Sequence, residues 1–360
     1  MRLPRKYTLI LCIIAILGLF QFGCSAKVSA PQVQLNSKII IKNEIPVGHI
    51  IGGVKNIQKS DLAKAEGDEI AVIGQASYFL LSSQNYNVFE YKDYKNKNGE
   101  PIYFGLSPQL LDINNDYDLE ILLGGGGFGK VGLLDNKGSV KWEFRTNSEI
   151  PPRKMIPAVS DHYKEITFYI SDYTGLYRLN SNGEIVWHFA STSFSDVSLL
   201  NNGAIVGLTR ENELMFFNDD GNPQKKIEVT DKINNFEIIK WPSDENFLVE
   251  NESNVIKIIN FKGQIIFQYK IDNFQSYHPP QALTVRFEKT KQPYLVILLH
   301  SRSALGVSQL NIISPNGELV YQEIIKSTNG ICINNDPESM REVLLVGNGQ
   351  KGLFEYKMNH

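Results

Sequence analysis

Residues 112–144 read DINNDYDLEILLGGGGFGKVGLLDNKGSVKWEF, and weaker copies of this phrase recur along the 360-residue chain. The phrase predicts an acidic loop, a short apolar strand, a second strand, a turn ending at Gly138 and a third strand carrying Trp142 and Phe144. On a strand, the alternation Trp-x-Phe places both rings on one face, which suits packing between neighbouring sheets.

The turn glycine is the clearest mark of the repeat. It recurs at spacings of 38 to 54 residues, at Gly138, Gly183, Gly221, Gly263 and Gly317. An earlier copy has Asn85 at the turn, and Asn also tolerates the left-handed backbone conformation. A period near 40–50 residues, made of short strands and Gly or Asn turns, is typical of a β-propeller. The sequence therefore predicts an all-β fold of this architecture.

The number of repeats predicts the number of blades. Apolar strands begin at seven places, Ile70, Ile121, Ile166, Ala204, Phe247, Leu295 and Val343. The last copy stops after two strands, so residues 38–42 are expected to supply an outer strand and close the ring, which removes exposed sheet edges. We predict seven blades; the degenerate copies leave six or eight open, and two β-sandwich domains in series are the competing architecture.

Composition and charge exclude several classes of function. The chain is 42% hydrophobic and 21% charged, with 16 Tyr and 19 Phe, which is typical of a globular protein rich in short strands. Its net charge is −3, and removal of residues 1–23 leaves 33 basic and 39 acidic residues, a net charge of −6. Because no basic stripe with interleaved aromatic residues occurs, we expect no nucleic acid partner.

The N-terminus predicts export. Residues 1–6 are basic, residues 7–23 are apolar, and Gly23-Cys24 follows, so residues 1–23 are expected to be a signal peptide. This junction resembles the lipobox of bacterial lipoproteins, which implies cleavage before Cys24 and lipidation of its sulfur and its new amine. Acyl chains would hold the protein on a membrane of the cell envelope. An uncleaved anchor and cleavage after Ala26 are the alternatives.

The remaining chain divides into a linker and a single domain. Residues 24–37, rich in Ser, Ala, Gln and Pro, are expected to form the lipidated cysteine and a flexible tether. Residues 38–360 are expected to form the propeller. Within them Cys332 is the single thiol, so no intramolecular disulfide can form, and we expect it to be a small buried apolar residue.

The acidic loop predicts a metal site. Oxygen-bearing side chains stand at alternate positions, Asp112, Asn114, Asp116, Asp118 and Glu120. A tight loop with this spacing can direct several oxygens at one hard cation, and Ca²⁺ fits better than Mg²⁺ because it accepts 6–8 oxygen ligands in loose geometry. The alternative is a solvated turn rich in Asp and Asn.

The loop also resembles the FG-GAP/VCBS repeats of integrin-type propellers. The resemblance implies side-chain ligands from Asp112, Asn114, Asp116 and Glu120, and the backbone carbonyl of Asp118. Those repeats have Gly where this chain has Tyr117, so Tyr117 must take a positive φ or alter the turn. Residues 135–144 and 180–189 resemble PQQ-like propeller repeats. Together the resemblances imply an exported propeller of the binding or adhesion kind.

Motifs for catalysis are missing from the sequence. No G-x-S-x-G or H-E-x-x-H occurs, and the histidines are scattered, with His188 expected on the solvent side of its strand. Residues 194–203 resemble a motif of arylsulfotransferase propellers in which a His precedes the Asp. Here Ser195 takes that place before Asp196, so the catalytic group is lacking. We therefore predict that the protein is not an enzyme.

These observations predict a membrane-anchored, exported propeller that acts as a scaffold for a protein or cell-surface partner. By analogy, it resembles the propeller lipoprotein of bacterial outer-membrane assembly complexes. One alternative is an exported enzyme that uses a quinone cofactor or transfers a sulfuryl group, which would need a polar, titratable cluster at the channel mouth. A second alternative is a calcium-dependent adhesion or carbohydrate-binding module.

Overall fold

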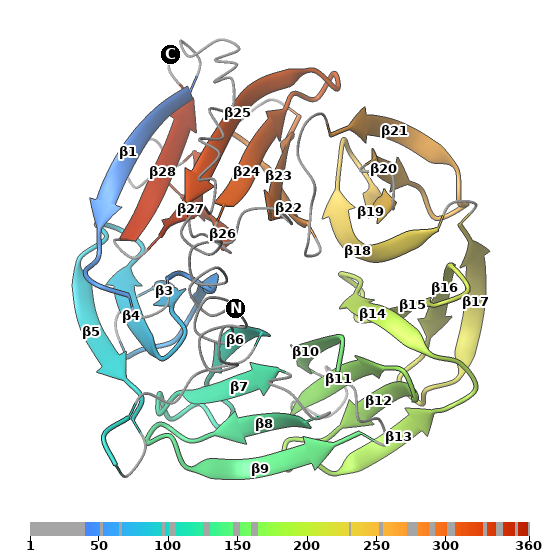
Figure 1. Ribbon diagram of the computed structural model, residues 1–360, viewed down its shortest axis with the longest axis horizontal. Coiled ribbons are helices and arrows are strands. Elements are labelled where there is room, and N and C mark those ends of the chain that lie inside the picture. Colours follow the sequence, from blue (N-terminus) through green and yellow to red (C-terminus); the bar gives the residue numbers. More distant parts are fainter. Residues whose placement is uncertain are drawn as a thin grey trace, which may run out of the picture. The chain divides into compact units, whose positions relative to one another are not determined.

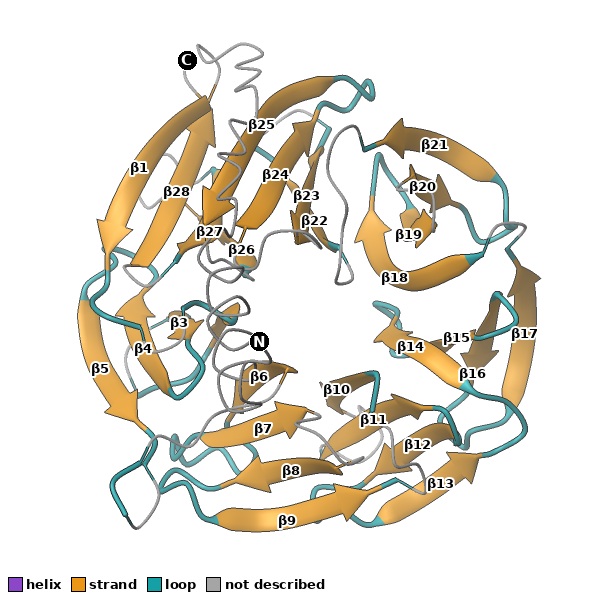
Figure 2. Cartoon of the chain, viewed as in Figure 1, coloured by secondary structure: helices purple, strands orange, loops and turns teal. Residues whose placement is uncertain are grey.

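The chain forms seven four-stranded antiparallel sheets arranged in a ring, a seven-bladed β-propeller (Figure 1). This computed structural model describes residues 40–50, 53–64, 67–95, 98–100, 106–124, 130–146, 152–159, 165–229, 232–251, 255–271, 280–287, 292–300, 307–326, 330–335, 341–349 and 352–358. Strands, turns and loops make up all of these residues (Figure 2). Among them, no helix has the length and apolar character needed to span a membrane.

Each blade runs from a first strand near the propeller axis to a fourth strand at the periphery. Blade 1 contains β2 (Asn56–Ser60), β3 (Glu69–Ile73), β4 (Ser77–Ser82) and β5 (Val88–Asp93). Blade 2 contains β6 (Leu106–Leu111), β7 (Glu120–Gly124), β8 (Lys130–Leu134) and β9 (Val140–Arg145). Blade 3 contains β10 (Lys154–Val159), β11 (Ile166–Asp172), β12 (Gly175–Leu179) and β13 (Ile185–Phe189). Blade 4 contains β14 (Phe194–Leu199), β15 (Ile205–Thr209), β16 (Glu213–Phe217) and β17 (Pro223–Glu228).

The remaining blades continue in the same order. Blade 5 contains β18 (Ile233–Lys240), β19 (Glu245–Asn251), β20 (Val255–Ile259) and β21 (Ile265–Lys270). Blade 6 contains β22 (Gln281–Val285), β23 (Tyr294–His300), β24 (Val307–Ile313) and β25 (Leu319–Lys326). Blade 7 combines β26 (Ile331–Asn335), β27 (Glu342–Asn348) and β28 (Gly352–Met358) with β1 (Ile40–Pro46) as its fourth strand.

The predicted architecture is confirmed. All seven predicted strand onsets lie within the second strand of a blade or directly before it. The competing arrangement of two β-sandwiches is wrong, because each sheet uses consecutive strands and the last sheet joins the two ends of the described chain. The repeated phrase covered the second, third and fourth strands of a blade, and the first strand was not part of it.

The ring is closed by an N-terminal strand, as predicted. β1 pairs with β28 in antiparallel register from Ile40↔Met358 to Pro46↔Gly352. The strand ends four residues later than the predicted range 38–42, and residues 38 and 39 lie outside the described part of the chain. Lys42 on β1 also forms an ion pair with Glu323 on β25 and lies over the ring of Phe354, 3.5 Å from its centroid, which ties the closing strand to blade 6.

The core consists of apolar clusters between neighbouring blades. In β3, Ala71 and Ile73 pack toward blade 2, whereas Ile70 and Val72 pack toward blade 7. All five residues of β3 are therefore buried. This explains why the second and third strands read as continuous apolar runs, since both faces of these strands leave water.

The outer strands join each blade to the next through the predicted aromatic residues. The indole nitrogen of Trp142 donates to the carbonyl of Ser181 at 3.0 Å, and that of Trp187 donates to the carbonyl of Asp219 at 2.8 Å. The equivalent Lys225 donates to the carbonyl of Phe261 at 2.7 Å. Each acceptor stands two residues before the turn glycine of the next blade, so the repeat in the sequence is a repeated contact between blades.

The turn glycines make this contact possible. Gly221 has a φ of +79°, and a Cβ added to it would lie 2.6 Å from the indole ring of Trp187. Gly183 has a φ of +80° and stands in the same relation to Trp142, at 2.7 Å. A side chain at either position would meet both an unfavourable backbone conformation and a steric clash.

We expect Gly221→Ala to destabilise the protein more than Gly203→Ala. Both glycines have a φ near +80°, but a Cβ at Gly203 would meet nothing within 4 Å. Both substitutions should cost about 1–2 kcal/mol from the left-handed backbone. Gly221→Ala should cost about 1–3 kcal/mol more, because Trp187 must move. Denaturant unfolding of the full chain measures the difference, and equal unfolding free energies would contradict an inter-blade role for this glycine.

Candidate functional site

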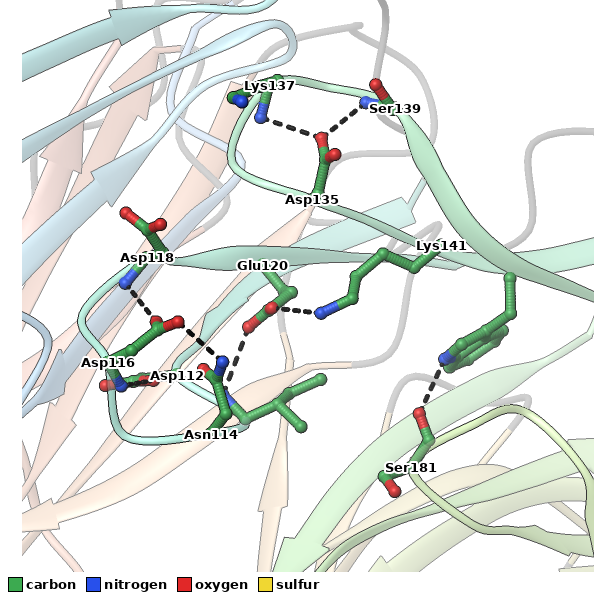
Figure 3. A network of polar contacts seen from close by, with 12 residues as sticks. Asp112, Asn114, Asp116, Asp118, Glu120, Asp135, Lys137, Ser139, Lys141 and Ser181 are labelled. Atoms are coloured by element: carbon green, nitrogen blue, oxygen red, sulfur yellow. Dashed lines mark hydrogen bonds and ion pairs between the residues drawn. The ribbon is translucent and has the colours of Figure 1, made fainter.

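The acidic loop connects the first and second strands of blade 2 and is held by its own side chains (Figure 3). The carboxylate of Asp112 accepts hydrogen bonds from the backbone amides of Asp116 at 3.1 Å and Tyr117 at 3.0 Å. Asp116 accepts from the amide of Asp118 at 2.7 Å and from the side-chain amide of Asn114 at 2.6 Å. The loop is therefore a compact turn in which carboxylates cap backbone amides.

The backbone of this loop takes the unfavourable conformation expected at Tyr117. Its φ is +67°, and Asn115 two residues earlier has a φ of +58°. Asn tolerates this region, whereas for Tyr it costs free energy of order 1–3 kcal/mol. The loop therefore makes the same left-handed turn at Tyr117 that a Gly would adopt at lower cost.

Glu120 serves the fold in a way that the sequence did not indicate. Its side chain is buried, and it accepts from the amide of Ile113 at 3.2 Å and from the ammonium of Lys141 on β9 at 2.6 Å. Glu69 stands at the same place in blade 1 and accepts from the amides of Leu62 at 2.7 Å and Ala63 at 2.9 Å. An acid at the first position of the second strand therefore caps the preceding loop in both blades.

This geometry bears on the predicted calcium site. Asp112, Asn114 and Asp116 lie together on the loop, but the carboxylate of Glu120 pairs with Lys141 through one oxygen and accepts from the amide of Ile113 through the other (Figure 3). Among the residues that the structure describes, no group of three or more His, Cys, Asp or Glu side chains is arranged to hold a metal ion. The predicted ligand set fits calcium only if Lys141 releases Glu120, and calcium binding stays a prediction.

A second polar cluster joins the first strands of three blades. Lys154 on β10 lies 3.3 Å from Asp196 on β14 and 3.2 Å from Glu237 on β18, measured from its ammonium nitrogen to a carboxylate oxygen of each. Asp196 also accepts from the amides of Val197 at 2.8 Å and Phe236 at 3.0 Å. The cluster, which we name the axial triad, links blades 3, 4 and 5 where they approach the axis.

The charges of the axial triad depend on one another. Burial alone would lower the pKa of Lys154, but the charges of Asp196 and Glu237 outweigh it and raise that pKa above its ordinary value. Burial raises the pKa of Glu237, although Lys154 acts in the opposite direction. Lys154 and Glu237 each keep about a quarter of their side-chain surface exposed, 26% and 27%, so both reach water beside the axis.

Sequence reasoning singled out Asp196 and missed Lys154 and Glu237. The three residues are separated by 42 and 41 residues, which is the length of the repeat. Charged residues that recur at the repeat length inside otherwise apolar segments are a signal that could have found them.

The two edges of the propeller differ in charge. Because neighbouring strands are antiparallel, the turns between second and third strands lie on the same edge as the connections between blades, which we name the connection edge. Its described loop residues include five bases and two acids, namely Lys55, Lys95, Arg153, Arg210 and Lys232 with Glu100 and Glu211.

The other edge, which we name the far edge, carries the remaining loops and is acidic. Its described loop residues include twelve acids and five bases, namely Asp61, Asp68, Asp112, Asp116, Asp118, Asp135, Glu165, Glu184, Asp219, Asp220, Asp244 and Glu318 with Lys64, Lys137, Lys262, Arg286 and Arg341. Both edges carry five bases in their described loops, so the connection edge is net positive because it has two acids where the far edge has twelve.

A shallow pocket of about 330 Å³ lies at the periphery between blades 3 and 4. Arg178, Trp187 and Asp219 are among its lining residues. The guanidinium of Arg178 donates to the carbonyl of Asp219 at 2.6 Å, the same oxygen that accepts from Trp187. The pocket therefore lies at the contact between the two blades. Its arginine takes part in that contact through its bond to Asp219.

Two single-residue predictions need correction. Cys332 lies on β26 and is only half buried, packed against apolar residues of blades 7 and 1; burial raises the pKa of its thiol to about 11. His188 does not face open solvent, because its ring stacks on Tyr177 with centroids 3.8 Å apart and it lies 3.0 Å from the carbonyl of Thr174.

Comparisons with known proteins support the fold. No known protein-family profile and no curated protein sequence matches the chain. It is similar in structure to BBS1N in its complex with ARL6DN, with a TM-score of 0.57 and 11% identity over 89% of this chain and 96% of that one. Virginiamycin B lyase from Staphylococcus aureus gives a TM-score of 0.56 and 12% identity over 88% and 99%. At these identities the likeness shows the propeller fold alone.

We expect Lys154→Met to lower the free energy of unfolding by about 2–4 kcal/mol near neutral pH, because it leaves two carboxylates without their cation. Loss of the ammonium also raises the pKa of Glu237 further. Such a carboxyl contributes stability below its unfolded pKa of about 4.3 and loses it as the pH rises through the folded pKa. The deficit against the unsubstituted chain should therefore be smaller near pH ~5 than near pH ~8.

Unfolding of the full chain in denaturant at both pH values tests this expectation. Adding Asp196→Asn and Glu237→Gln to Lys154→Met should restore most of the lost stability. Lys226→Met is the matched control, since Lys226 pairs with Glu213 at 2.8 Å on the surface, and it should cost about 1 kcal/mol or less. A deficit that does not change with pH would show that the triad's charges do not govern it.

Proposed function

We propose that the protein is an exported β-propeller, anchored in the cell envelope by lipid on Cys24, that serves as a scaffold for a protein partner. Residues 1–39, which include the predicted signal peptide and Cys24, lie outside the described part of the chain, so export and lipidation rest on the sequence. The seven-bladed fold supports the scaffold because the loops that join its strands lie on two opposite edges of the ring.

One observation carries the preference for a scaffold. In the described residues, the axial triad joins blades to one another. Lys154 forms ion pairs with two carboxylates, and Asp196 also accepts hydrogen bonds from two backbone amides. A general base or nucleophile needs a group whose proton or lone pair is available to a substrate. The axial triad is better suited to holding the ring than to chemistry.

The similar structures agree with this proposal without deciding it. BBS1N is a propeller in complex with another protein, whereas virginiamycin B lyase is a propeller that is a lyase. A fold that serves both purposes does not assign function by itself. The assignment therefore depends on the groups of this chain.

The exported enzyme is the second candidate, and the axial triad favours it in one respect. That candidate requires a polar, titratable cluster at the channel mouth, and Glu237 is a titratable group near the axis with part of its side chain exposed. Glu237 would have to act through the exposed part of its carboxylate while paired with Lys154. Calcium-dependent adhesion is a third candidate, and it depends on the acidic loop.

We expect the full chain to form a specific protein complex in the envelope of its own cells. Crosslinking in intact cells, followed by extraction in mild detergent, should yield one or a few protein adducts that re-form from purified components. Cys24→Ser should abolish incorporation of a labelled fatty acid into the chain, because the sulfur that accepts the lipid is lost. A chain that stays free of adducts at every crosslinker concentration, while abundant and folded, would rule out the scaffold.

We expect calcium to bind the acidic loop only weakly unless Lys141 is removed. A ligand that binds only the native state stabilises it by about 2.7 kcal/mol at 100 times its Kd. Lys141→Met should therefore increase the stabilisation by calcium, and Asp116→Ala should abolish it. Thermal unfolding with calcium and with a chelator measures both. Identical midpoints in calcium and chelator for the unsubstituted chain and for Lys141→Met would refute the calcium site.

A further inference from the structure

Three loops on the connection edge bring two arginines to one tyrosine. Arg153 stands directly before β10, Tyr173 lies in the turn between β11 and β12, and Arg210 lies in the turn between β15 and β16. The guanidinium carbon of each arginine is 4.7 Å from the centroid of the Tyr173 ring. We name this group the arginine clamp; it spans blades 3 and 4.

The clamp is built on fixed backbone. The hydroxyl of Ser193 donates to the carbonyl of Tyr173 at 2.5 Å, and the carbonyl of Ser193 accepts from the amide of Arg210 at 3.2 Å. The amide of Arg153 donates to the carbonyl of Ser171 at 2.9 Å. The turns that carry Tyr173 and Arg210 are thus tied together through Ser193, and Arg153 is tied to β11, before any ligand arrives. Little backbone conformational entropy is therefore lost on binding, which favours affinity.

The guanidinium groups of the clamp are available to a ligand. Both arginine side chains are exposed, and within the described part of the chain neither has an ion pair with an acid. Both guanidinium carbons lie 4.7 Å from one ring centroid, so two positive charges are held near each other, and a bound anion would offset their repulsion. Each guanidinium also keeps a planar set of donors that matches a carboxylate.

The composition of the clamp favours a protein ligand. Tyr and Arg are the residues that dominate binding energy at protein–protein interfaces, and here they are in direct contact. Anionic membranes and nucleic acids are bound by larger sets of basic residues. The connection edge has only five bases in its described loops, spread over several blades. Two neighbouring arginines on one ring can pair with only a few carboxylates, as one short acidic segment of a protein would present.

The position of the clamp agrees with a lipid anchor. β1 runs from Ile40 on the far edge to Pro46 on the connection edge, because it is antiparallel to β28 and Pro46 pairs with Gly352 beside the β27–β28 turn. A chain that comes from an anchor at Cys24 therefore enters the propeller at the edge opposite the clamp. The clamp would be left open to a partner.

We propose that Arg153, Tyr173 and Arg210 form the docking site for an acidic segment of the protein partner, with carboxylates of Asp or Glu paired to the two guanidinium groups. This inference rests on the scaffold function proposed above and names the chemistry of its partner. The ring of Tyr173 keeps the two arginines in position and offers an apolar surface to the stem of the bound side chains.

The test uses the full chain in nonionic detergent and a fluorescein-labelled peptide of repeated Asp-Glu-Gly triplets, followed by fluorescence anisotropy. The Asn-Gln-Gly peptide of the same length is the uncharged control and should not bind. We expect Arg153→Gln with Arg210→Gln to weaken binding of the acidic peptide by about tenfold or more. Lys55→Gln with Lys95→Gln removes the same charge from the same edge at blade 1 and should change the affinity by less than about threefold.

Further variants separate geometry from charge. Arg153→Lys with Arg210→Lys keeps both charges but loses the planar donors, so it should still weaken binding. Because both arginines are exposed, these substitutions should leave the midpoint of thermal unfolding unchanged, which is measured for each variant. Equal affinity in the glutamine or lysine clamp variants and the unsubstituted chain would overturn the proposal. So would clamp-dependent binding of dihexanoyl-phosphatidylglycerol together with no binding of the acidic peptide, which would assign the clamp to a lipid headgroup.

Crosslinking and peptide binding together distinguish failure of the clamp proposal from failure of the scaffold function. If crosslinking in cells captures the same partner with the unsubstituted chain and with the clamp variants, the scaffold stands and the clamp proposal is wrong. If no partner complex forms in cells although the peptide binds through the clamp, the scaffold function is wrong and the carboxylate site is supported.

Discussion

The pairing of β1 with β28 is the contact on which the rest of the structure depends. The middle strands of each blade are buried on both faces, so a blade needs a neighbour on each side to remove its apolar surface from water. A ring provides two neighbours to every blade only if the first and last blades meet. Seven residues of β1 complete the seventh blade and thereby place blades 7 and 1 in contact. Loss of that pairing would expose the interface and the outer edge of β28 together.

Contacts between blades divide by distance from the axis. At the periphery, Trp142 and Trp187 reach the turn of the next blade, and the turn glycines leave room for their rings. Near the axis, where the first strands converge, the axial triad joins three blades through charge. Apolar clusters fill the space between. The propeller is thus held at its rim by aromatic rings and near its centre by ion pairs.

The sequence predicts the parts of this fold that obey a local rule. A turn with positive φ favours Gly, and a strand buried on both faces requires apolar residues, so their recurrence reveals the blades. Blade 1 lacks the turn Gly, and there Tyr86, rather than the predicted Asn85, has the positive φ, of +59°. The first strands obey no such rule. They are half exposed beside the axis, and β6 and β10 even contain Pro108 and Pro157, so their position is set by pairing with the second strand. Lys154 and Glu237 lie on these first strands, so no local pattern in the sequence predicts them.

Glu120 shows why site prediction is harder than fold prediction. Its spacing from Asp112 is a local property and suggests a shared cation, but its partner Lys141 comes from another strand, 21 residues later. The capping role that Glu120 shares with Glu69 also explains why blade 1 has an acid at the start of its second strand without the rest of the acidic loop. A residue retained in a repeat can therefore serve the loop's backbone rather than a ligand. Charges that no such structural need explains, as in the arginine clamp on the opposite edge, are the better guide to what the propeller binds.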